Sequence, residues 1–246
     1  MDVDAYLDRI GADRNISLRE LHRANQTAVP FENLSIHLGE TISLNPEDLF
    51  DKIVRRRRGG FCYELNGAIA IVLEELGYAV ARVGVRVHTG EGFGPIFDHL
   101  ALLVTDHDGE QWLFDVGFGN HSTYPLKVSD RGEQNDPGGV FVIAPTPDGD
   151  LLVNRDGKPE YQVEPRARDL VDFEPACWWQ QTWPGSHFRK GTICTRLDGD
   201  GRITISGRNL IRTNQAGRSE TTLDNDAELL AAYRNHFGVI LDRVVF

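Results

Sequence analysis

Three side chains of the sequence have the chemistry of a cysteine-based catalytic triad. Cys62 supplies a thiol, His99 an imidazole and Asp115 a carboxylate. A catalytic cysteine needs a base that takes its proton and a third group that orients the base. Each residue also has a structural interpretation, because most free cysteines are small buried hydrophobes and most of the eight histidines must be bystanders. The surroundings of each residue therefore decide between the two interpretations.

The residues around Cys62 favour the chemical interpretation. Residues 55–58 are four arginines that end one helical pattern, and we expect Gly59 and Gly60 to stop that helix through a left-handed turn. A second helical pattern begins at Cys62 and continues to Gly77. Free backbone N–H groups and the helix dipole at such an N-terminus stabilise negative charge on a sulfur, and the thiolate is the reactive species.

A predicted hairpin carries the other two residues. His99 opens one strand and Asp115 closes the next. Register decides whether they meet, because side chains alternate between the two faces of a strand. A two-residue turn would place them on opposite faces. A three-residue loop, 107–109, with Gly109 in the left-handed conformation pairs Asp115 with Ala101 and brings it diagonal to His99 on one face. We predict this loop.

A zinc site is a competing use of the same three residues. One thiolate, one imidazole and one carboxylate lack the paired cysteines or closely spaced histidines of zinc sites, so we expect no metal. The remaining cysteines, Cys177 and Cys194, are expected to be structural. We expect Trp178, Trp179 and Trp183 to lie in the core.

The overall composition narrows the class of protein. The chain has 246 residues, 40% hydrophobic and 26% charged, and can bury a sizeable core. No apolar run is long enough to cross a bilayer, and three scattered cysteines indicate a reducing compartment. A formal net charge of −11 disfavours a nucleic-acid-binding surface. We expect a cytoplasmic protein that binds neither nucleic acid nor membrane, as a monomer or homodimer.

The periodicity of the sequence changes from helical to alternating near Ala79. Residues 1–83 are predicted to be helical, with Ser17 and Asn45 as helix N-caps. Short alternating strands follow, separated by Asp-Gly and proline-rich turns, which is typical of an antiparallel sheet or barrel. A final amphipathic helix is predicted over 227–237.

Six stretches resemble the arylamine N-acetyltransferase family, in order and over nearly the whole chain. They are Pro30-Phe31-Glu32-Asn33-Leu34, Arg58-Gly59-Gly60-Phe61-Cys62-Tyr63-Glu64-Leu65-Asn66, His99-Leu100-Ala101-Leu102-Leu103-Val104, Asp115-Val116-Gly117-Phe118-Gly119, Ser186-His187-Phe188 and Ser206-Gly207-Arg208. The resemblance implies an α+β fold with a helical bundle over 1–83, an antiparallel β-barrel over 84–190 and an α/β lid over 191–246. The triad arrangement would be that of papain-like proteases. We expect a shorter lid than in many relatives.

The resemblance also implies a role for each matched residue. Cys62 would be the acetylated nucleophile, His99 its base and Asp115 the carboxylate that orients the base. Glu32 and Arg58 would form a buried ion pair that positions the nucleophile segment, which agrees with the need to pair a buried charge.

Four residues are implied to lie at the substrate site. Phe118 would line the acceptor pocket and Phe188 would lie near its mouth. Phe31 belongs to the connector beside the active site, and Gly119 to the loop that approaches the coenzyme. Asn120 follows where many bacterial relatives have another glycine, so we expect a differently shaped coenzyme site.

The function implied by the resemblance is acetyl transfer from acetyl-CoA to an arylamine or arylhydrazine, as in xenobiotic metabolism. The mechanism would be ping-pong, through an acetylated cysteine. An amide synthase that closes a macrolactam from a polyketide chain is the nearest alternative. A cysteine peptidase or transglutaminase-like hydrolase uses the same triad with water as acceptor. A binding module without activity ranks last, because all three triad positions are filled.

Overall fold

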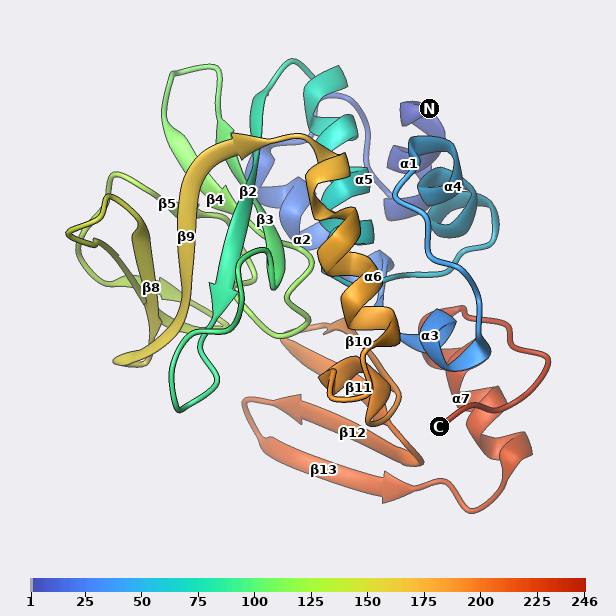
Figure 1. Ribbon diagram of the computed structural model, residues 1–246. Coiled ribbons are helices and arrows are strands. Elements are labelled where there is room, and N and C mark those ends of the chain that lie inside the picture. The colour runs from blue at the N-terminus through green and yellow to red at the C-terminus, as the bar shows by residue number, and fades with distance from the viewer. Residues whose placement is uncertain (1) are drawn as a thin grey trace.

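A group of helices, a curved antiparallel sheet and a smaller C-terminal sheet meet near the start of helix α5 in the computed structural model (Figure 1). The structure describes residues 2–246, and Met1, the first residue of the expected unit 1–83, lies outside the described residues. The helices of the N-terminal part are α1 (Val3–Ile10), α2 (Leu18–Ala28), α3 (Leu34–Leu38), α4 (Pro46–Phe50), the π-helix η1 (Asp51–Arg55) and α5 (Cys62–Glu75).

The helices begin at the predicted capping residues. The Ser17 hydroxyl accepts a hydrogen bond from the Glu20 N–H, and the Asn45 side chain accepts one from the Glu47 N–H. Each cap satisfies a backbone donor that has no partner within its own helix. Helix α5 begins at Cys62, as predicted.

The turn that leads into α5 differs from the prediction. Arg57, and not Gly59 or Gly60, adopts the left-handed conformation, with a φ of 52°. Gly59 is needed for a close approach instead, because a Cβ there would lie 1.8 Å from the carbonyl oxygen of Pro30. The segment that precedes Cys62 therefore packs directly against the connector that follows α2.

Eight antiparallel strands form a nearly closed barrel in the order β5-β4-β3-β2-β9-β8-β7-β6. The strands are β2 (Ala79–Val87), β3 (His99–Thr105), β4 (Gln111–Phe114), β5 (Leu126–Lys127), β6 (Gln134–Asp136), β7 (Gly139–Pro145), β8 (Leu151–Arg155) and β9 (Lys158–Arg168). The Gln134 amide bridges the two edge strands, bonding the N–H and the carbonyl of Lys127 at 2.7 and 2.9 Å. The predicted α+β class with a central antiparallel barrel is confirmed.

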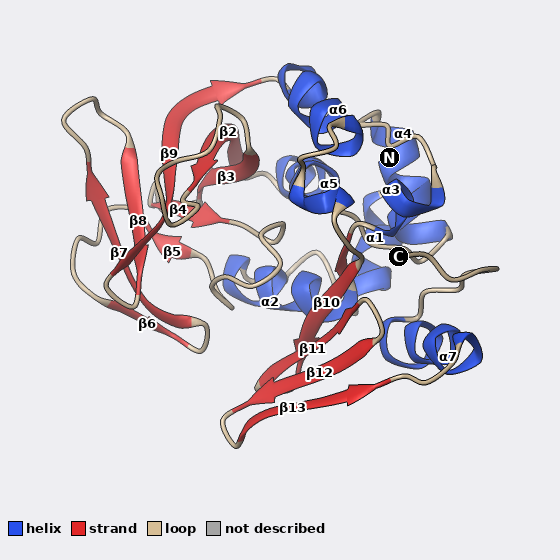
Figure 2. Cartoon of the chain, turned by 60° about the horizontal axis from the view of Figure 1, so that its bottom comes forward, coloured by secondary structure: helices blue, strands red, loops and turns tan. Residues whose placement is uncertain are grey.

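A five-stranded sheet, β1-β10-β11-β12-β13, and helix α7 form the C-terminal part, which Figure 2 shows below the barrel and the helices. Its elements are β1 (Phe31–Glu32), β10 (Ile193–Asp198), β11 (Gly201–Ser206), β12 (Asn209–Asn214), β13 (Gly217–Thr222) and α7 (Asp226–Phe237). The sequence analysis missed β12 and β13, whose polar and largely exposed residues lack an apolar alternation. It also missed β1, a short strand inside the region predicted to be helical.

A helical connection joins the barrel to the C-terminal sheet. It consists of η2 (Leu170–Phe173), α6 (Glu174–Thr182) and η3 (His187–Arg189). Phe173 and Cys177 pack with the apolar cluster around α5. The prediction that the tryptophans lie in the core is wrong. Trp178 and Trp183 are 65% and 47% exposed, and Trp179 is half-buried with its ring stacked on Trp183 at 4.4 Å. They lie on the outer side of this connection, where periodicity alone could not place them.

The three expected units share elements at their boundaries. Strand β2 crosses the expected boundary between 1–83 and 84–190. The helical part, the barrel and the C-terminal part each contain an apolar cluster, but Phe173 and Cys177 belong to the first cluster. The division into these units stays a prediction.

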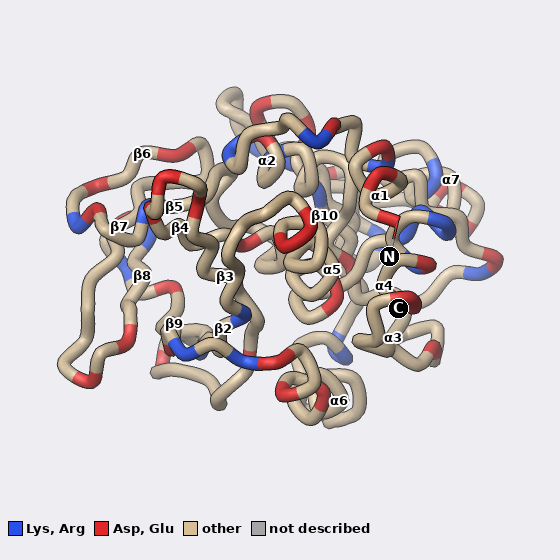
Figure 3. The backbone as a smooth tube through the Cα atoms, turned by 90° about the horizontal axis from the view of Figure 1, so that it is seen from above, with Lys and Arg blue, Asp and Glu red and all other residues tan. Residues whose placement is uncertain are grey.

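Charged residues are distributed along helices, strands and loops alike (Figure 3). Within residues 2–246 every helix is too short or too polar to cross a bilayer.

Candidate active site

Cys62 lies at the base of a pocket of about 840 Å³ where the helices, the barrel and the C-terminal sheet meet. It is the first residue of α5, and only 2% of it is exposed. His99 and Phe118 of the barrel, and Phe31 and Phe188 from outside it, line the same pocket. The thiol is thus enclosed but open to a ligand on one side.

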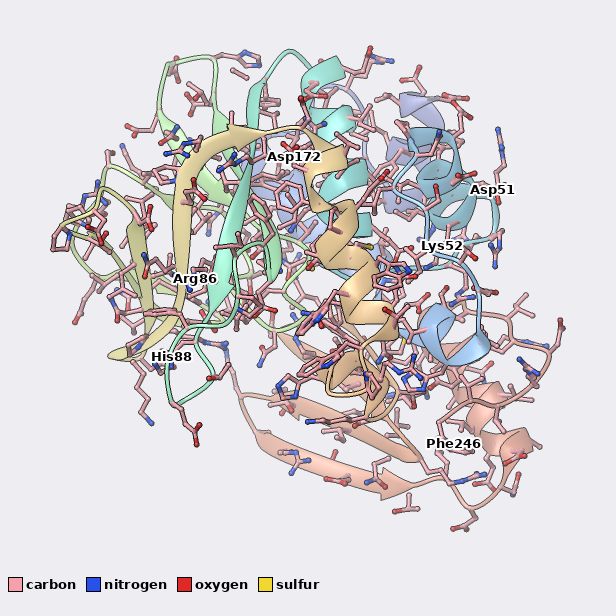
Figure 4. All side chains as sticks on the ribbon, in the orientation of Figure 1. Asp51, Lys52, Arg86, His88, Asp172 and Phe246 are labelled. Carbon is pink, nitrogen blue, oxygen red and sulfur yellow. The ribbon has the colours of Figure 1, made fainter. Side chains whose placement is uncertain are left out.

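A buried ion pair holds the helix start in place. One carboxylate oxygen of Glu64 accepts the Phe61 N–H at 3.2 Å, and the other pairs with the Lys52 ammonium at 2.6 Å. Burial raises the pKa of Glu64, and the Lys52 charge opposes that rise. Lys52 lies on the segment after α4, beside Asp51 (Figure 4). The sequence analysis missed this pair, because nothing local shows that Lys52 turns inward.

The predicted pair of Glu32 and Arg58 is present and buried. Their side chains are 0% and 4% exposed, and the shortest nitrogen–oxygen distance is 2.8 Å. Glu32 also accepts the Leu34 N–H at 2.7 Å. Burial raises the pKa of Glu32, but the charges of Lys52 and Arg58 outweigh burial and lower it overall. The pair fastens the nucleophile segment to β1 of the C-terminal sheet.

The hairpin between β3 and β4 has the predicted register. Asp106 donates its N–H to the Glu110 carbonyl at 2.9 Å, and Gly109 is left-handed with a φ of 84°. The next pairs along the ladder include Leu102 with Phe114. This register brings His99 and Asp115 to the same face.

His99 and Asp115 form a buried pair. His99 Nε2 lies 2.7 Å from Asp115 Oδ2, and the two residues are 3% and 1% exposed. Burial opposes a charge on His99, but Asp115 and the Cys62 sulfur outweigh it and raise the pKa of His99 to about 10. Burial likewise opposes ionisation of Asp115, but the charge of His99 and its hydrogen bond hold the pKa of Asp115 well below its usual range. Since Asp115 occupies Nε2, Nδ1 of His99 is left for the thiol.

Asn66 connects helix α5 to this pair. Its amide nitrogen donates to Asp115 Oδ1 at 2.8 Å and to the Leu100 carbonyl at 2.6 Å, while its oxygen accepts the Val116 N–H at 3.0 Å. Asn66 lies one helical turn after Cys62, so both face the barrel. That i, i+4 spacing of an amide and a thiol was the sequence signal that could have identified it.

His22 of α2 supports the same carboxylate from behind. Its Nε2 accepts the backbone N–H of Asp115 at 3.2 Å, and its Nδ1 lies 2.9 Å from the Thr123 carbonyl. Burial lowers the pKa of His22 to about 4, so this imidazole is neutral at physiological pH. The sequence analysis did not single out His22.

Two glycines shape the loop after Asp115. A Cβ on Gly117 would lie 2.8 Å from the Cα of Cys62. Gly119 has a φ of 87°, and a Cβ there would lie 3.1 Å from the Phe31 ring. Both positions therefore favour glycine, the first because two backbones touch and the second because the left-handed conformation is also strained for other residues.

The structure brings the four predicted substrate residues to one place. The Phe118 ring meets the His99 ring edge-on at 5.2 Å. The Phe31 and Phe188 rings lie 6.2 Å apart on the other wall. Gly119 borders Phe31, and His88 lies just beyond the end of β2 at the pocket mouth (Figure 4). The mouth also includes His187, which is exposed.

The pocket thus brings together a thiol, an imidazole and a buried carboxylate, which are the groups that acyl transfer through a cysteine requires. In the described part of the chain, no group of three or more histidine, cysteine or acidic residues has the arrangement of a metal site.

Known proteins identify the family. A family model described as N-acetyltransferase matches residues 16–245. The arylamine N-acetyltransferase of Mycolicibacterium smegmatis is 34% identical and aligns over 98% of this chain and 93% of its own length. That of Escherichia coli is 30% identical over 92% of this chain and 83% of its own.

Solved structures agree. The Mycobacterium marinum arylamine N-acetyltransferase in complex with CoA superposes with a TM-score of 0.88 and 32% identity, covering 97% of this chain and 93% of that one. The Salmonella typhimurium enzyme gives a TM-score of 0.88 at 29% identity, covering 96% and 90%. The chain belongs to the arylamine N-acetyltransferase family, which is a family of acyltransferases.

Proposed function

We propose that this protein transfers the acetyl group of acetyl-CoA to aromatic amines or hydrazines by a ping-pong mechanism through acetyl-Cys62. The observation that carries the proposal is the enclosed Cys62 thiol facing the buried pair of His99 and Asp115. The Mycobacterium marinum relative was solved in complex with CoA, which supports a coenzyme A thioester as the donor.

In the first half-reaction, His99 takes the thiol proton and the Cys62 sulfur attacks the thioester carbonyl. The tetrahedral intermediate collapses when the coenzyme A sulfur leaves with a proton from His99, and acetyl-Cys62 remains. The Cys62 N–H belongs to the first turn of α5, where it has no acceptor within its helix and can bind the oxyanion. Exchange between two sulfurs is nearly balanced in energy, which suits a shuttling intermediate.

In the second half-reaction, the amine nitrogen attacks the acetyl carbonyl of acetyl-Cys62. His99 accepts the proton that the nitrogen loses, and the Cys62 sulfur leaves as a thiolate. Asp115 keeps the imidazole in one orientation and stabilises its charged form in both half-reactions.

We assign the aromatic acceptor to the wall formed by Phe118, Phe31 and Phe188. These rings are half-buried or buried around the pocket, so a flat ring can exchange water contacts for aromatic ones. The loop at Gly119 would approach the coenzyme. Glu32 and Arg58 would support the nucleophile without touching the substrate.

Mass spectrometry of the intact protein tests the proposal. Mixing with acetyl-CoA should add one acetyl group to Cys62, and an arylamine should then remove it with release of the acetylated amine. Cys62→Ala should not be labelled, whereas the matched control Cys194→Ala should be, because Cys194 is buried away from the pocket. An unlabelled wild type contradicts the proposal. Loss of the acetyl group to water without any amine dependence would favour a cysteine hydrolase.

We also propose a cytoplasmic location, because all three cysteines are free. The three-unit division at 83 and 190 is kept as a proposal, to be tested by limited proteolysis near those positions.

A further inference from the structure

A second buried histidine lies behind the candidate triad. His121 is 3% exposed and belongs to the loop that leaves Gly119. Its ring packs against Phe118 at 5.4 Å, Phe141 at 4.8 Å and Tyr161 at 5.0 Å. A polar ring among aromatic side chains needs hydrogen-bond partners to offset the water it has lost.

Both nitrogens of His121 have such partners. Nδ1 lies 2.7 Å from Glu160 Oε2, and Nε2 lies 2.9 Å from the Tyr161 hydroxyl. An ionised Glu160 can only accept, so Nδ1 carries a proton. Arg155 approaches the other Glu160 oxygen at 3.3 Å and donates to the Asn120 carbonyl at 2.9 Å, which fixes the far end of the network.

Tyr161 connects this network to the triad. Its hydroxyl is the hydrogen-bond partner of His121 Nε2, and its ring faces the His99 side of the triad. Burial, and then the charge of Asp115, raise the pKa of Tyr161 well above its usual range, so the hydroxyl keeps its proton. The Tyr161 ring also lies 5.3 Å from Phe118 and 6.1 Å from His99.

We propose that His121, held by Glu160, is a positioning residue that fixes the Tyr161 and Phe118 rings against the His99 ring. The inference rests on the proposed function of the triad. Asn66 fixes Asp115 from α5, and the Phe118 and Tyr161 rings bound the His99 ring from inside the barrel, at 5.2 and 6.1 Å. His99 keeps its orientation toward Cys62 because its carboxylate partner is held by Asn66 and its own ring is held by these two rings.

Iodoacetamide alkylation of Cys62 tests the inference without requiring any acetyl donor. His121→Phe keeps a ring but removes both nitrogens, and Tyr161→Phe removes a single oxygen. Each should lower the alkylation rate at neutral pH roughly tenfold and change its pH profile, because a small misplacement of a reacting group has a large effect on rate. The control His107→Phe alters an exposed hairpin residue and should behave as wild type.

Two further variants separate positioning from packing. His121→Gln offers an amide donor and acceptor, and should recover part of the rate lost in His121→Phe. The double variant His121→Phe/Tyr161→Phe should be no slower than the slower single variant, because both changes break one link.

The inference is overturned if the folded His121→Phe and Tyr161→Phe proteins keep the wild-type alkylation profile, or if their losses multiply in the double variant. If His121→Phe fails to fold, Tyr161→Phe alone decides. An unacetylated but normally alkylated wild type would instead overturn the proposed function and leave the positioning result standing on its own.

Discussion

The floor and the mouth of the pocket are built differently. The floor consists of Cys62, His99 and Asp115 with Asn66 behind them, and all four are at least 97% buried. The mouth consists of Phe188, His187, His88 and Thr89, which are half-buried or exposed. The polar atoms of the Asp115 carboxylate each have a partner in the fold, whereas the mouth is mostly open surface.

This difference separates two tasks. A buried group with fixed partners holds one geometry, because any rearrangement leaves a polar atom unpaired in an apolar interior. Half-exposed residues can be replaced or moved with little effect on folding. The floor is therefore the fixed part of the pocket, and the mouth is the part that can vary. Under the proposed function, the floor would carry out the reaction and the mouth would select the acceptor.

The largest effect is expected at Asp115. Asp115→Asn keeps the side-chain shape but cannot stabilise a charged imidazole, and should slow acetylation of Cys62 by about 10⁴-fold. The rate of acetyl-enzyme formation in rapid-quench experiments measures this, with the exposed hairpin variant Asp108→Asn as control. If the acetylation rate of Asp115→Asn fell by less than tenfold, the reaction of Cys62 would not depend on the Asp115 carboxylate.

The next effect concerns the ion pair under the floor. Glu32→Gln leaves the buried Arg58 charge with a longer ion contact, 3.6 Å, to Glu40 and a 3.4 Å hydrogen bond to the Ser35 hydroxyl. We expect the free energy of unfolding to fall by about 3–5 kcal/mol, as for other broken buried pairs. Urea unfolding gives the value. The control Arg55→Gln removes an exposed ion pair with Asp51 and should change the free energy of unfolding by less than about 1 kcal/mol. If Glu32→Gln and Arg55→Gln had equal effects, the buried pair would be no more important for stability than the exposed one.

The lowered pKa of His22 predicts how the stability of the protein changes at acidic pH. Its folded pKa of about 4 lies below its unfolded value of about 6.5, so the unfolded state binds the extra proton. Stability from this group is present above the unfolded pKa and is lost as the pH falls toward 4, by at most about 3 kcal/mol. The free energy of unfolding, measured with urea at several pH values in this range, should depend less steeply on pH in His22→Gln than in the wild type. Equal pH dependences of the two proteins would contradict the lowered pKa of His22.

The smallest effect is expected at the mouth. Phe188→Leu should raise the KM for an arylamine by roughly tenfold or less, because it removes only part of one apolar wall. The rate of Cys62 acetylation should stay the same. Trp183→Leu changes an exposed ring outside this pocket and serves as the control. A slower acetylation in Phe188→Leu would show that the mouth also shapes the floor.

The features that could be predicted from the sequence are those determined by neighbouring residues. Ser17 and Asn45 cap helices through bonds to residues two or three positions away, and the left-handed Gly109 determined the hairpin register. Each of these depends on a few neighbouring residues. The register then fixed the face shared by His99 and Asp115.

Contacts between distant segments could not be predicted in this way. Lys52 and Glu64 are 12 residues apart, and His121 and Glu160 are 39 apart. Their pairing depends on how α5 and the barrel pack, and no local pattern encodes it. The left-handed turn at Arg57 also depends on a distant contact. Gly59 must pass close to Pro30, and this packing places the turn two residues earlier in the chain.

The contact between Gly117 and Cys62 has a consequence for assembly. No side chain separates the barrel loop from helix α5 at this point. The thiol lies on the helix and the imidazole and carboxylate lie on the barrel, so the three groups meet only when the two segments are in contact. A separation by the thickness of one methyl group would disconnect sulfur from imidazole while leaving helix and sheet intact. During unfolding, activity would then be lost before the circular dichroism signal of the helices and strands changes. During refolding, the return of activity would report when the two segments pack against each other.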